Sequence, residues 1–409
     1  MTLRHGPSGL RPAQLSRSAF GRSARLRLSR KVRQAPTLLA LCACAINTAT
    51  TGSAAQQDRS SNALFSRAVA QRLNTTIAKI AREHNLPSVA VGVRVPGRGE
   101  YRFVTGYANL QTRAERRFAQ PFRIASVTKA FVAAAVLQLI DHGRLRKTDR
   151  LARWYPRFPN AALITVDDLL RMRSGIAAPN DDEVLAAVYD HPLQAAPTLA
   201  QMMASAAKLY RQFKKPNREG VYTDLNYYIL GGIVRRVTRR DIGSLITDNL
   251  IRKLGLRETS YPSGVELPGG LHGYGWAVRT KRFDDKTTFN PPLAGAAGAM
   301  ISSVGDLQTY IRVLCRGGLF KTATQRAMLQ GQPLAGSATR YGEGVISNPG
   351  ICGHSGTING FNTDVYYFEK PDAAVVVNVN RLDKDNEPQT TPVLQQVFKT
   401  LESQLNVRP

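Results

Sequence analysis

Segments typical of β-strands lie near both ends of the chain, whereas segments typical of helices fill its middle. Residues 88–94 alternate in polarity and are rich in valine, and residues 101–104 follow a Pro-Gly-Arg-Gly turn, which predicts a β-hairpin. Residues 362–368 and 373–380 predict two further strands. Because a hairpin alone is only marginally stable in water, its strands need partners. We therefore predict an α/β fold of the α+β type, with one antiparallel sheet built from both ends of the chain and flanked by helices.

Apolar residues at helical spacing predict the remaining elements. The sheet is expected to use about residues 62–122 and 290–409, with an all-helical region at about residues 123–289 inserted between them. Thr165 and Asp168 have the spacing of a capping box, which predicts the start of a helix. The Gly-Tyr-Gly-Trp sequence at 273–276 predicts a loop or a tight turn. The predicted helices are 64–84, 126–141, 165–172, 183–213 with breaks at Pro192 and Pro197, 224–238, 241–254 and 391–406.

The first 55 residues predict a targeting segment. Residues 1–34 are rich in arginine and serine and lack acids, and the apolar stretch 35–46 is too short to span a bilayer comfortably. A Ser-Ala-Ala sequence then precedes Gln56, as at a signal-peptidase site, which predicts a periplasmic or secreted domain of residues 56–409. Two alternatives remain: a lipid anchor on Cys44 and a mitochondrial transit peptide.

The formal net charge of +27 raises the possibility of a nucleic-acid partner. Nine of the basic residues lie in the leader, and no remaining run of lysine or arginine is interleaved with aromatic residues. The densest cluster, at 235–240, falls on a predicted helix, where a solvated face is the simpler interpretation. No nucleic-acid partner is expected, although a basic surface would suit an anionic cell envelope or an acidic polymer.

The sequence contains no spacing typical of a metal site. It has no HExxH or CxxC pattern, and its six histidines are scattered, so neither a metal nor a cofactor is predicted. Only Cys315 and Cys352 follow the leader. These two thiols could pair in an oxidising compartment, but cysteines at unrelated positions are more often buried free thiols, and the sequence does not decide between the two states.

The most informative local pattern is Ser126-Val-Thr-Lys129, at the start of the apolar stretch 126–141. Residues three apart on a helix point in the same direction, and a serine at a helix N-terminus feels the positive end of the macrodipole. Burial lowers the pKa of a lysine unless a partner holds the charge. Lys129 is therefore a candidate base or proton carrier for Ser126.

Two further motifs follow in the chain. Residues 221–228 read Val-Tyr-Thr-Asp-Leu-Asn-Tyr-Tyr ahead of a predicted helix, and residues 353–357 read Gly-His-Ser-Gly-Thr ahead of a predicted strand. In this order, the three motifs resemble SxxK, Tyr-x-Asn and Lys/His-Ser/Thr-Gly of the penicillin-recognising serine enzymes. The resemblance covers about residues 65–400 and is greatest to class C β-lactamases and the related D-alanyl-D-alanine carboxypeptidases and esterases. It implies a β-lactamase/transpeptidase-like fold.

The resemblance also implies roles for individual residues. Ser126 would be the nucleophile, and Lys129 and Tyr222 would move its proton to the leaving group. The oxyanion hole would consist of the backbone N–H groups of Ser126 and Thr357, and such donors are each worth about 3 to 4 kcal/mol. A tyrosine needs a pKa below its usual value of about 10 to act as a base near neutrality. The other implied substrate-binding residues are Asp224, His354, Ser355 and Gly356.

Two residues depart from the usual motifs. Asp224 stands where the family often has asparagine, and a carboxylate there would keep Lys129 charged and transfer the role of base to Tyr222. His354 replaces a lysine found in many β-lactamases, and a neutral imidazole attracts a substrate carboxylate less than an ammonium does. This second departure favours peptidase or esterase chemistry over efficient hydrolysis of β-lactams.

The predicted function is a serine hydrolase that acts through an acyl-enzyme, most like a D-alanyl-D-alanine carboxypeptidase of the cell envelope. The alternatives are a penicillin-reactive esterase or weak β-lactamase, and a catalytically weak protein that binds the cell wall. The expected partner is a small molecule or peptide: a peptidoglycan stem peptide, a β-lactam or an ester. Contact with a membrane is expected only through the leader or a lipid anchor, and no oligomeric state is predicted.

Overall fold

A computed structural model describes residues 64–177, 193–277, 281–383 and 389–405. The predicted targeting segment and the first part of the helix predicted at 183–213 lie outside these ranges. Among the described residues, no helix combines the length and the apolar character needed to span a membrane.

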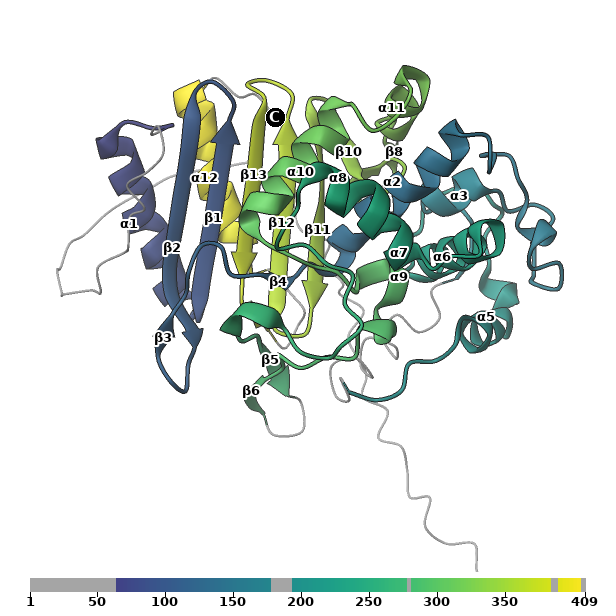
Figure 1. Cartoon of the computed structure of the whole chain (residues 1–409), viewed down its shortest axis with the longest axis horizontal. Coiled ribbons are helices and arrows are strands. Elements are labelled where there is room, and N and C mark those ends of the chain that lie inside the picture. Colours follow the sequence, from purple (N-terminus) through teal and green to yellow (C-terminus); the bar gives the residue numbers. More distant parts are fainter. Residues whose placement is uncertain (1–63, 178–192, 278–280, 384–388, 406–409) are drawn as a thin grey trace, which may run out of the picture. The chain divides into compact units, whose positions relative to one another are not determined.

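One antiparallel sheet joins the two ends of the chain, as the sequence predicts (Figure 1). The N-terminal strand β1 (Ser88–Val95) pairs with β13 (Ala373–Val379), almost 300 residues later in the chain. Within the described residues the strand order is β3-β2-β1-β13-β12-β11-β10-β9-β8. The other strands are β2 (Gly99–Asn109), β3 (Ala114–Glu115), β8 (Gln332–Pro333), β9 (Arg340–Tyr341), β10 (Ile346–Asn348), β11 (Ile351–Ile358) and β12 (Phe361–Phe368).

Helices cover both faces of this sheet (Figure 1). Val89, Val91 and Val93 of β1 pack on one face against α1 (Arg67–Glu83) and α12 (Thr391–Leu405). The opposite face packs against α10 (Val304–Arg316) and the inserted helices. Gly92 faces α10 so closely that a Cβ atom there would lie 2.5 Å from Val304, so this strand position requires glycine.

The inserted region is built around α2 (Thr128–Asp141), most of whose residues are buried. Its apolar character on all sides explains this position, because a helix without a polar face must be enclosed by other elements. The predicted capping box of Thr165 and Asp168 is confirmed at the start of α3 (Val166–Leu170). The remaining helices are α5 (Leu199–Ala207), α6 (Leu225–Thr238), α7 (Ile242–Ile246), α8 (Arg252–Leu254), α9 (Gly295–Gly298) and α11 (Thr322–Met328).

Two local predictions need correction. The helix predicted at 241–254 is divided, because a π-helical turn at Thr247–Ile251 separates α7 from α8. The loop or turn predicted at 273–276 is largely a strand, β5 (Tyr274–Ala277). It pairs with β6 (Arg282–Asp285) and with β14 (Arg381–Leu382), which is about 100 residues away in the chain and therefore invisible to local pattern reading.

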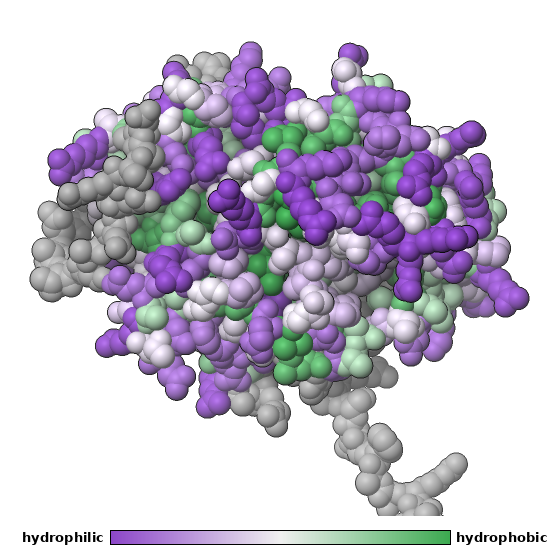
Figure 2. Space-filling view, in the orientation of Figure 1, coloured by the Kyte–Doolittle hydropathy of each residue, from purple (hydrophilic) through white to green (hydrophobic). Residues whose placement is uncertain are grey.

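The surface is mostly hydrophilic on the face drawn in Figure 2. The arginine cluster at 235–240 is exposed at the C-terminal end of α6, where positive charge is favourable to the helix dipole. Arg236 also lies 4.6 Å from the centre of the Tyr155 ring, in a cation–π contact. The helix dipole and the contact with Tyr155 therefore both stabilise positive charge at this end of α6.

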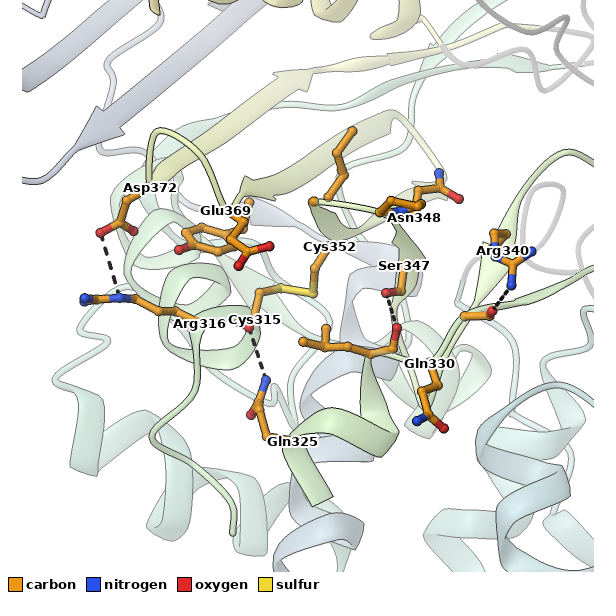
Figure 3. Close-up of a pocket in the computed structure, with 16 residues that line it drawn as sticks. Cys315, Arg316, Gln325, Gln330, Arg340, Ser347, Asn348, Cys352, Glu369 and Asp372 are labelled. Atoms are coloured by element: carbon orange, nitrogen blue, oxygen red, sulfur yellow. Dashed lines mark hydrogen bonds and ion pairs between the residues drawn. A yellow bond between two sulfur atoms is a disulfide. The ribbon is translucent and has the colours of Figure 1, made fainter. Parts of the chain in front are cut away.

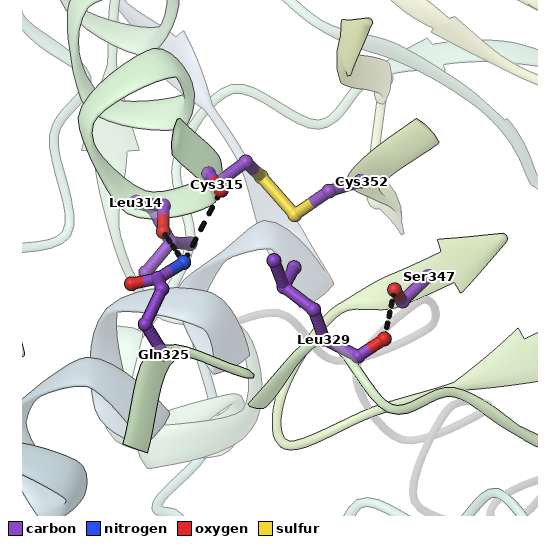
Figure 4. The surroundings of a disulfide bond; sticks show 6 residues. All are labelled: Leu314, Cys315, Gln325, Leu329, Ser347 and Cys352. Carbon is purple, nitrogen blue, oxygen red and sulfur yellow. Dashed lines mark hydrogen bonds between the residues drawn. A yellow bond between two sulfur atoms is a disulfide. The ribbon is translucent and has the colours of Figure 1, made fainter. Parts of the chain in front are cut away.

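The structure decides against the more usual state of free thiols, because Cys315 and Cys352 form a disulfide (Figure 4). Cys315 lies near the end of α10 and Cys352 near the start of β11, and their Cα atoms are 5.9 Å apart. Such a separation is within the usual range for a disulfide. The packing of α10 on the sheet creates this proximity, and nothing in the local sequence reports it.

Candidate active site

Ser126 lies in a tight turn that leads into the buried helix α2. The turn, Ala125–Val127, is a 3₁₀ helix, so Ser126 precedes the α-helix instead of starting it as predicted. Ala125 has a φ of +48°, a region that residues other than glycine rarely occupy, and such backbone strain is often found at functional sites. The turn is held by bonds from Ile124 N to Met300 O (3.0 Å) and from Val127 N to Ile124 O (3.1 Å).

The Lys129 ammonium lies at the centre of the cluster and is fully buried. Its Nζ atom is 2.8 Å from Ser126 Oγ, 2.9 Å from the Ala297 carbonyl oxygen and 2.7 Å from Asp224 Oδ1. Burial lowers the pKa of Lys129, but the charge of Asp224 and then Tyr222 raise it, and the net effect is a pKa above the usual value. The expectation that Asp224 keeps the lysine charged agrees with this geometry.

Tyr222 and Asp224 lie just before α6, which points this segment toward α2. The Tyr222 ring lies against the Lys129 ammonium, with Nζ 5.0 Å from the centre of the ring. Burial raises the pKa of Tyr222 more than the charge of Lys129 lowers it, and Asp224 raises it further. The lowered tyrosine pKa expected for a base near neutrality is therefore not found.

Strand β11 brings the third motif against the serine turn. The motif lies within this strand, not ahead of it as the sequence pattern indicated. A Cβ atom on Gly356 would lie 2.2 Å from the Ile124 carbonyl oxygen and 3.1 Å from Ser126 N, so the strand and the turn are in direct backbone contact. Thr357 follows on the same strand, and its hydroxyl accepts a hydrogen bond from Asn362 Nδ2 at 3.2 Å.

The two polar side chains of this motif face different surroundings. His354 is 2% exposed, with Nε2 3.0 Å from the Tyr341 hydroxyl and Nδ1 2.5 Å from the Ser355 carbonyl oxygen. Burial, with a smaller effect of Lys129, lowers the pKa of His354 to about 3, so the imidazole is neutral under physiological conditions. The Ser355 side chain instead lies beside Tyr366, on the neighbouring strand.

Three groups near the cluster did not emerge from the motifs alone. The Ala297 carbonyl accepts one of the Lys129 hydrogen bonds. Tyr227 of α6 and Tyr341 of β9 are buried beside Tyr222. Tyr341 belongs to a two-residue strand with no distinctive sequence pattern, so only the tertiary structure could identify it.

A large cavity lies elsewhere in the described part of the chain. It has a volume of about 740 Å³ and lies beside the disulfide, between α10, α11 and the hairpin of β10 and β11 (Figure 3). Its walls include Arg316, Arg340 and Glu369, and none of the eight predicted site residues. The chemistry of its side chains, and not the size of a cavity, therefore identifies the cluster around Ser126 as the candidate active site.

Comparisons with known proteins agree with the fold. A model of the Beta-lactamase family matches residues 66–398. Protein flp of Staphylococcus aureus (strain MW2) is 25% identical over 333 residues, which cover 76% of this chain but only 63% of that protein. The chain thus corresponds to somewhat less than two thirds of this longer relative.

Solved structures show the same fold. D-amino acid amidase from Ochrobactrum anthropi SV3 superposes with a TM-score of 0.71 at 23% identity, covering 81% of this chain and 99% of the amidase. A D-stereospecific amidohydrolase from Streptomyces sp. superposes with a TM-score of 0.69 at 26% identity, covering 81% and 98% of the two chains. The chain therefore belongs to the Beta-lactamase family.

Proposed function

We propose that the chain is an acyl-serine hydrolase in which Ser126 attacks the carbonyl carbon of an amide or ester. The Ser126 hydroxyl accepts a hydrogen bond from the Lys129 ammonium, which leaves its own hydrogen directed to Tyr222. Loss of that proton to the Tyr222 phenolate generates the nucleophile, and Tyr222 then protonates the leaving nitrogen or oxygen. The second half-reaction repeats these steps with water.

The resting charges of the cluster determine how this base works. Lys129 is positive and Asp224 balances it at 2.7 Å, so no excess positive charge remains to stabilise a phenolate. Because burial also raises the pKa of Tyr222, the phenolate is a minor species at neutral pH. Activity should therefore increase toward alkaline pH.

The oxyanion hole of the proposed mechanism uses the backbone N–H groups of Ser126 and Thr357. The contact between Gly356 and the serine turn supports this assignment. A methyl group added to Gly356 would lie 2.2 Å from the Ile124 carbonyl oxygen, so there is no room for one between the strand and the turn. Rigid backbone donors of this kind stabilise charge that develops in the transition state without reorganising.

We further propose that the scissile bond is an amide or ester whose leaving group carries no free carboxylate. The observation that carries this proposal is the state of His354, which is buried, neutral and already bonded to Tyr341 and Ser355. It provides no positive charge where many β-lactamases have a lysine. The likeness to a D-amino acid amidase and a D-stereospecific amidohydrolase supports amide substrates with a D-residue.

One assay distinguishes this proposal from the narrower prediction of a D-alanyl-D-alanine carboxypeptidase. The purified protein and Ser126→Ala would be tested on a D-alanyl-D-alanine peptide, the same peptide with a C-terminal amide, D-phenylalanine amide and a p-nitrophenyl ester. We expect the amide-capped peptide to exceed the free acid at least tenfold in kcat/KM, and Ser126→Ala to abolish turnover. A preference for the free acid would favour the carboxypeptidase, and no turnover of any substrate would contradict the acyl-serine proposal.

We also propose that the protein acts outside the reducing cytosol. The disulfide between Cys315 and Cys352 supports this, because such bonds persist in oxidising compartments. Fractionation of the native host, with mass spectrometry of the mature N-terminus, would test it. A start at Gln56 would agree with a cleaved signal, an acylated Cys44 would indicate a lipid anchor, and an uncleaved cytosolic chain would contradict the proposal.

A further inference from the structure

Tyr341 lies between two of the motif residues. Its side chain is 1% exposed, and its hydroxyl is 3.0 Å from His354 Nε2. Its ring stands edge-on to the ring of Tyr222, with centres 5.8 Å apart and planes at 87°. One buried side chain thus contacts both the proposed base and the histidine of the third motif.

The hydrogen bonds of His354 determine which of its nitrogens carries the proton. The Ser355 carbonyl oxygen can only accept, so His354 Nδ1 must donate to it. A neutral imidazole with its proton on Nδ1 has a lone pair on Nε2, and this lone pair accepts from the Tyr341 hydroxyl. Tyr341 therefore donates a hydrogen bond to His354, and His354 donates one to the backbone of β11.

Tyr341 also lies beside Tyr227 of α6, the helix that carries the second motif. The Tyr227 hydroxyl donates its one proton to the Leu170 carbonyl oxygen at 3.0 Å. The one hydroxyl proton of Tyr341 is given to His354.

We propose that Tyr341 is a positioning residue for the acyl-serine site: its hydroxyl donates to Nε2 of His354, whose proton lies on Nδ1, and its ring fixes the orientation of the Tyr222 ring. The role in turnover rests on the proposed function, whereas the tautomer of His354 does not. The consequence for specificity is that the third motif stays uncharged, because the one lone pair that could take up a proton is occupied by the tyrosine.

The first test needs no substrate. The full protein, labelled with ¹⁵N in histidine, would be examined by NMR between pH 5 and 8, with His354→Gln to assign the resonance. We expect His354 to show a protonated Nδ1 and an unprotonated Nε2 throughout this range. A proton on Nε2, or titration of the ring within this range, would overturn the proposal whether or not the protein hydrolyses any substrate.

The second test uses Tyr341→Phe, which keeps the ring but removes the donor. We expect His354 to keep its proton on Nδ1, because the Ser355 carbonyl oxygen still accepts it, whereas the Nε2 resonance should shift because its hydrogen-bond donor is lost. We also expect a fall of at least tenfold in kcat, with a smaller change in KM. In a His354→Gln background the same substitution should change kcat less than twofold, because its effect passes through the histidine. Equal losses in both backgrounds, or an unshifted Nε2 resonance in Tyr341→Phe, would overturn the proposal.

Tyr310 offers a matched control for the loss of a buried hydroxyl. It is also fully buried, stacks on Phe131 at a centre distance of 3.5 Å, and its hydroxyl has no hydrogen-bond partner among the described residues. Tyr310→Phe should therefore leave both kcat and the His354 resonances unchanged. A loss like that of Tyr341→Phe would mean that any buried tyrosine hydroxyl matters, and would remove the special role of Tyr341.

Discussion

The substitution Gly356→Ala tests whether the contact between β11 and the serine turn forms the oxyanion hole. The added methyl would lie 2.2 Å from the Ile124 carbonyl oxygen, where a normal contact needs roughly 1 Å more. The carbonyl cannot easily retreat, because it accepts the Val127 N–H bond within the same turn. The strand must therefore move away from Ser126, and Thr357 N–H moves with it.

The expected loss follows from that displacement. A misplacement of about 1 Å can cost about 100-fold in rate, and removal of one oxyanion donor costs about 100- to 1000-fold. We therefore expect kcat to fall at least 100-fold on the p-nitrophenyl ester. Overpacking of this kind typically costs about 1 to 3 kcal/mol of stability, so the variant should still fold, as thermal unfolding would show.

Gly353→Ala is the matched control on the same strand. Its methyl would meet the Val365 carbonyl oxygen at the same 2.2 Å, but on the side of the neighbouring strand and not the serine turn. We expect a similar loss of stability and a loss of kcat at least tenfold smaller. The reasoning would be refuted if Gly356→Ala kept kcat within fivefold of the wild type, or if both variants lost activity equally.

Three further predictions follow from the described contacts. Asp224→Asn should move the rising limb of kcat/KM against pH toward lower pH, because Asp224 raises the pKa of Tyr222. Burial raises the pKa of Asp364 from 3.8 to about 6, so this group stabilises the fold at low pH and loses that contribution as pH rises through about 6. Relative to the wild type, Asp364→Asn should gain about 2 kcal/mol in urea unfolding between pH 4 and 7. Replacing Cys315 and Cys352 by alanine should cost about 4 kcal/mol in the same assay, from the 37-residue separation.

Each of these predictions has an outcome that contradicts it. If the rising limb of kcat/KM lies at the same pH in Asp224→Asn as in the wild type, Tyr222 is not the titrating base. A difference between Asp364→Asn and the wild type that is the same at both pH values would show that water reaches the carboxylate. A cysteine-free variant within about 1 kcal/mol of the wild type would show that the disulfide does not constrain the unfolded chain.

Local patterns in the sequence were sufficient for the elements whose stability is local. The valine-rich alternation at 88–94 and the capping box at Thr165 both appear where predicted. The pairing of the two chain ends also follows from a simple requirement, that a lone hairpin cannot be stable. The disulfide and the pairing of β5 with β14 depend instead on contacts between segments distant in the chain, which no periodicity encodes.

For the candidate site, the sequence predicted which side chains are charged better than it predicted how deeply they are buried. The replacement of asparagine by Asp224 was enough to predict that Lys129 stays protonated, because a carboxylate next to an ammonium has that effect in almost any geometry. The pKa of Tyr222 could not be predicted in the same way. Its direction depends on how completely the ring is buried, and burial is a property of the whole fold.

The burial of Tyr222 changes how the cluster should be understood. If Lys129 acted alone on Tyr222, its charge would favour the phenolate; with Asp224 present, the pair is neutral and the phenolate would introduce a net negative charge into a buried site. His354 cannot compensate, since it is neutral and bonded to Tyr341. In the transition state, the serine proton moves to Tyr222 and the negative charge moves toward the N–H groups of Ser126 and Thr357. The buried tyrosine then no longer carries that charge. The same neutrality that makes the resting base weak therefore makes the oxyanion hole the principal source of stabilisation, which is why substitution of Gly356 should be more damaging than substitution of Asp224.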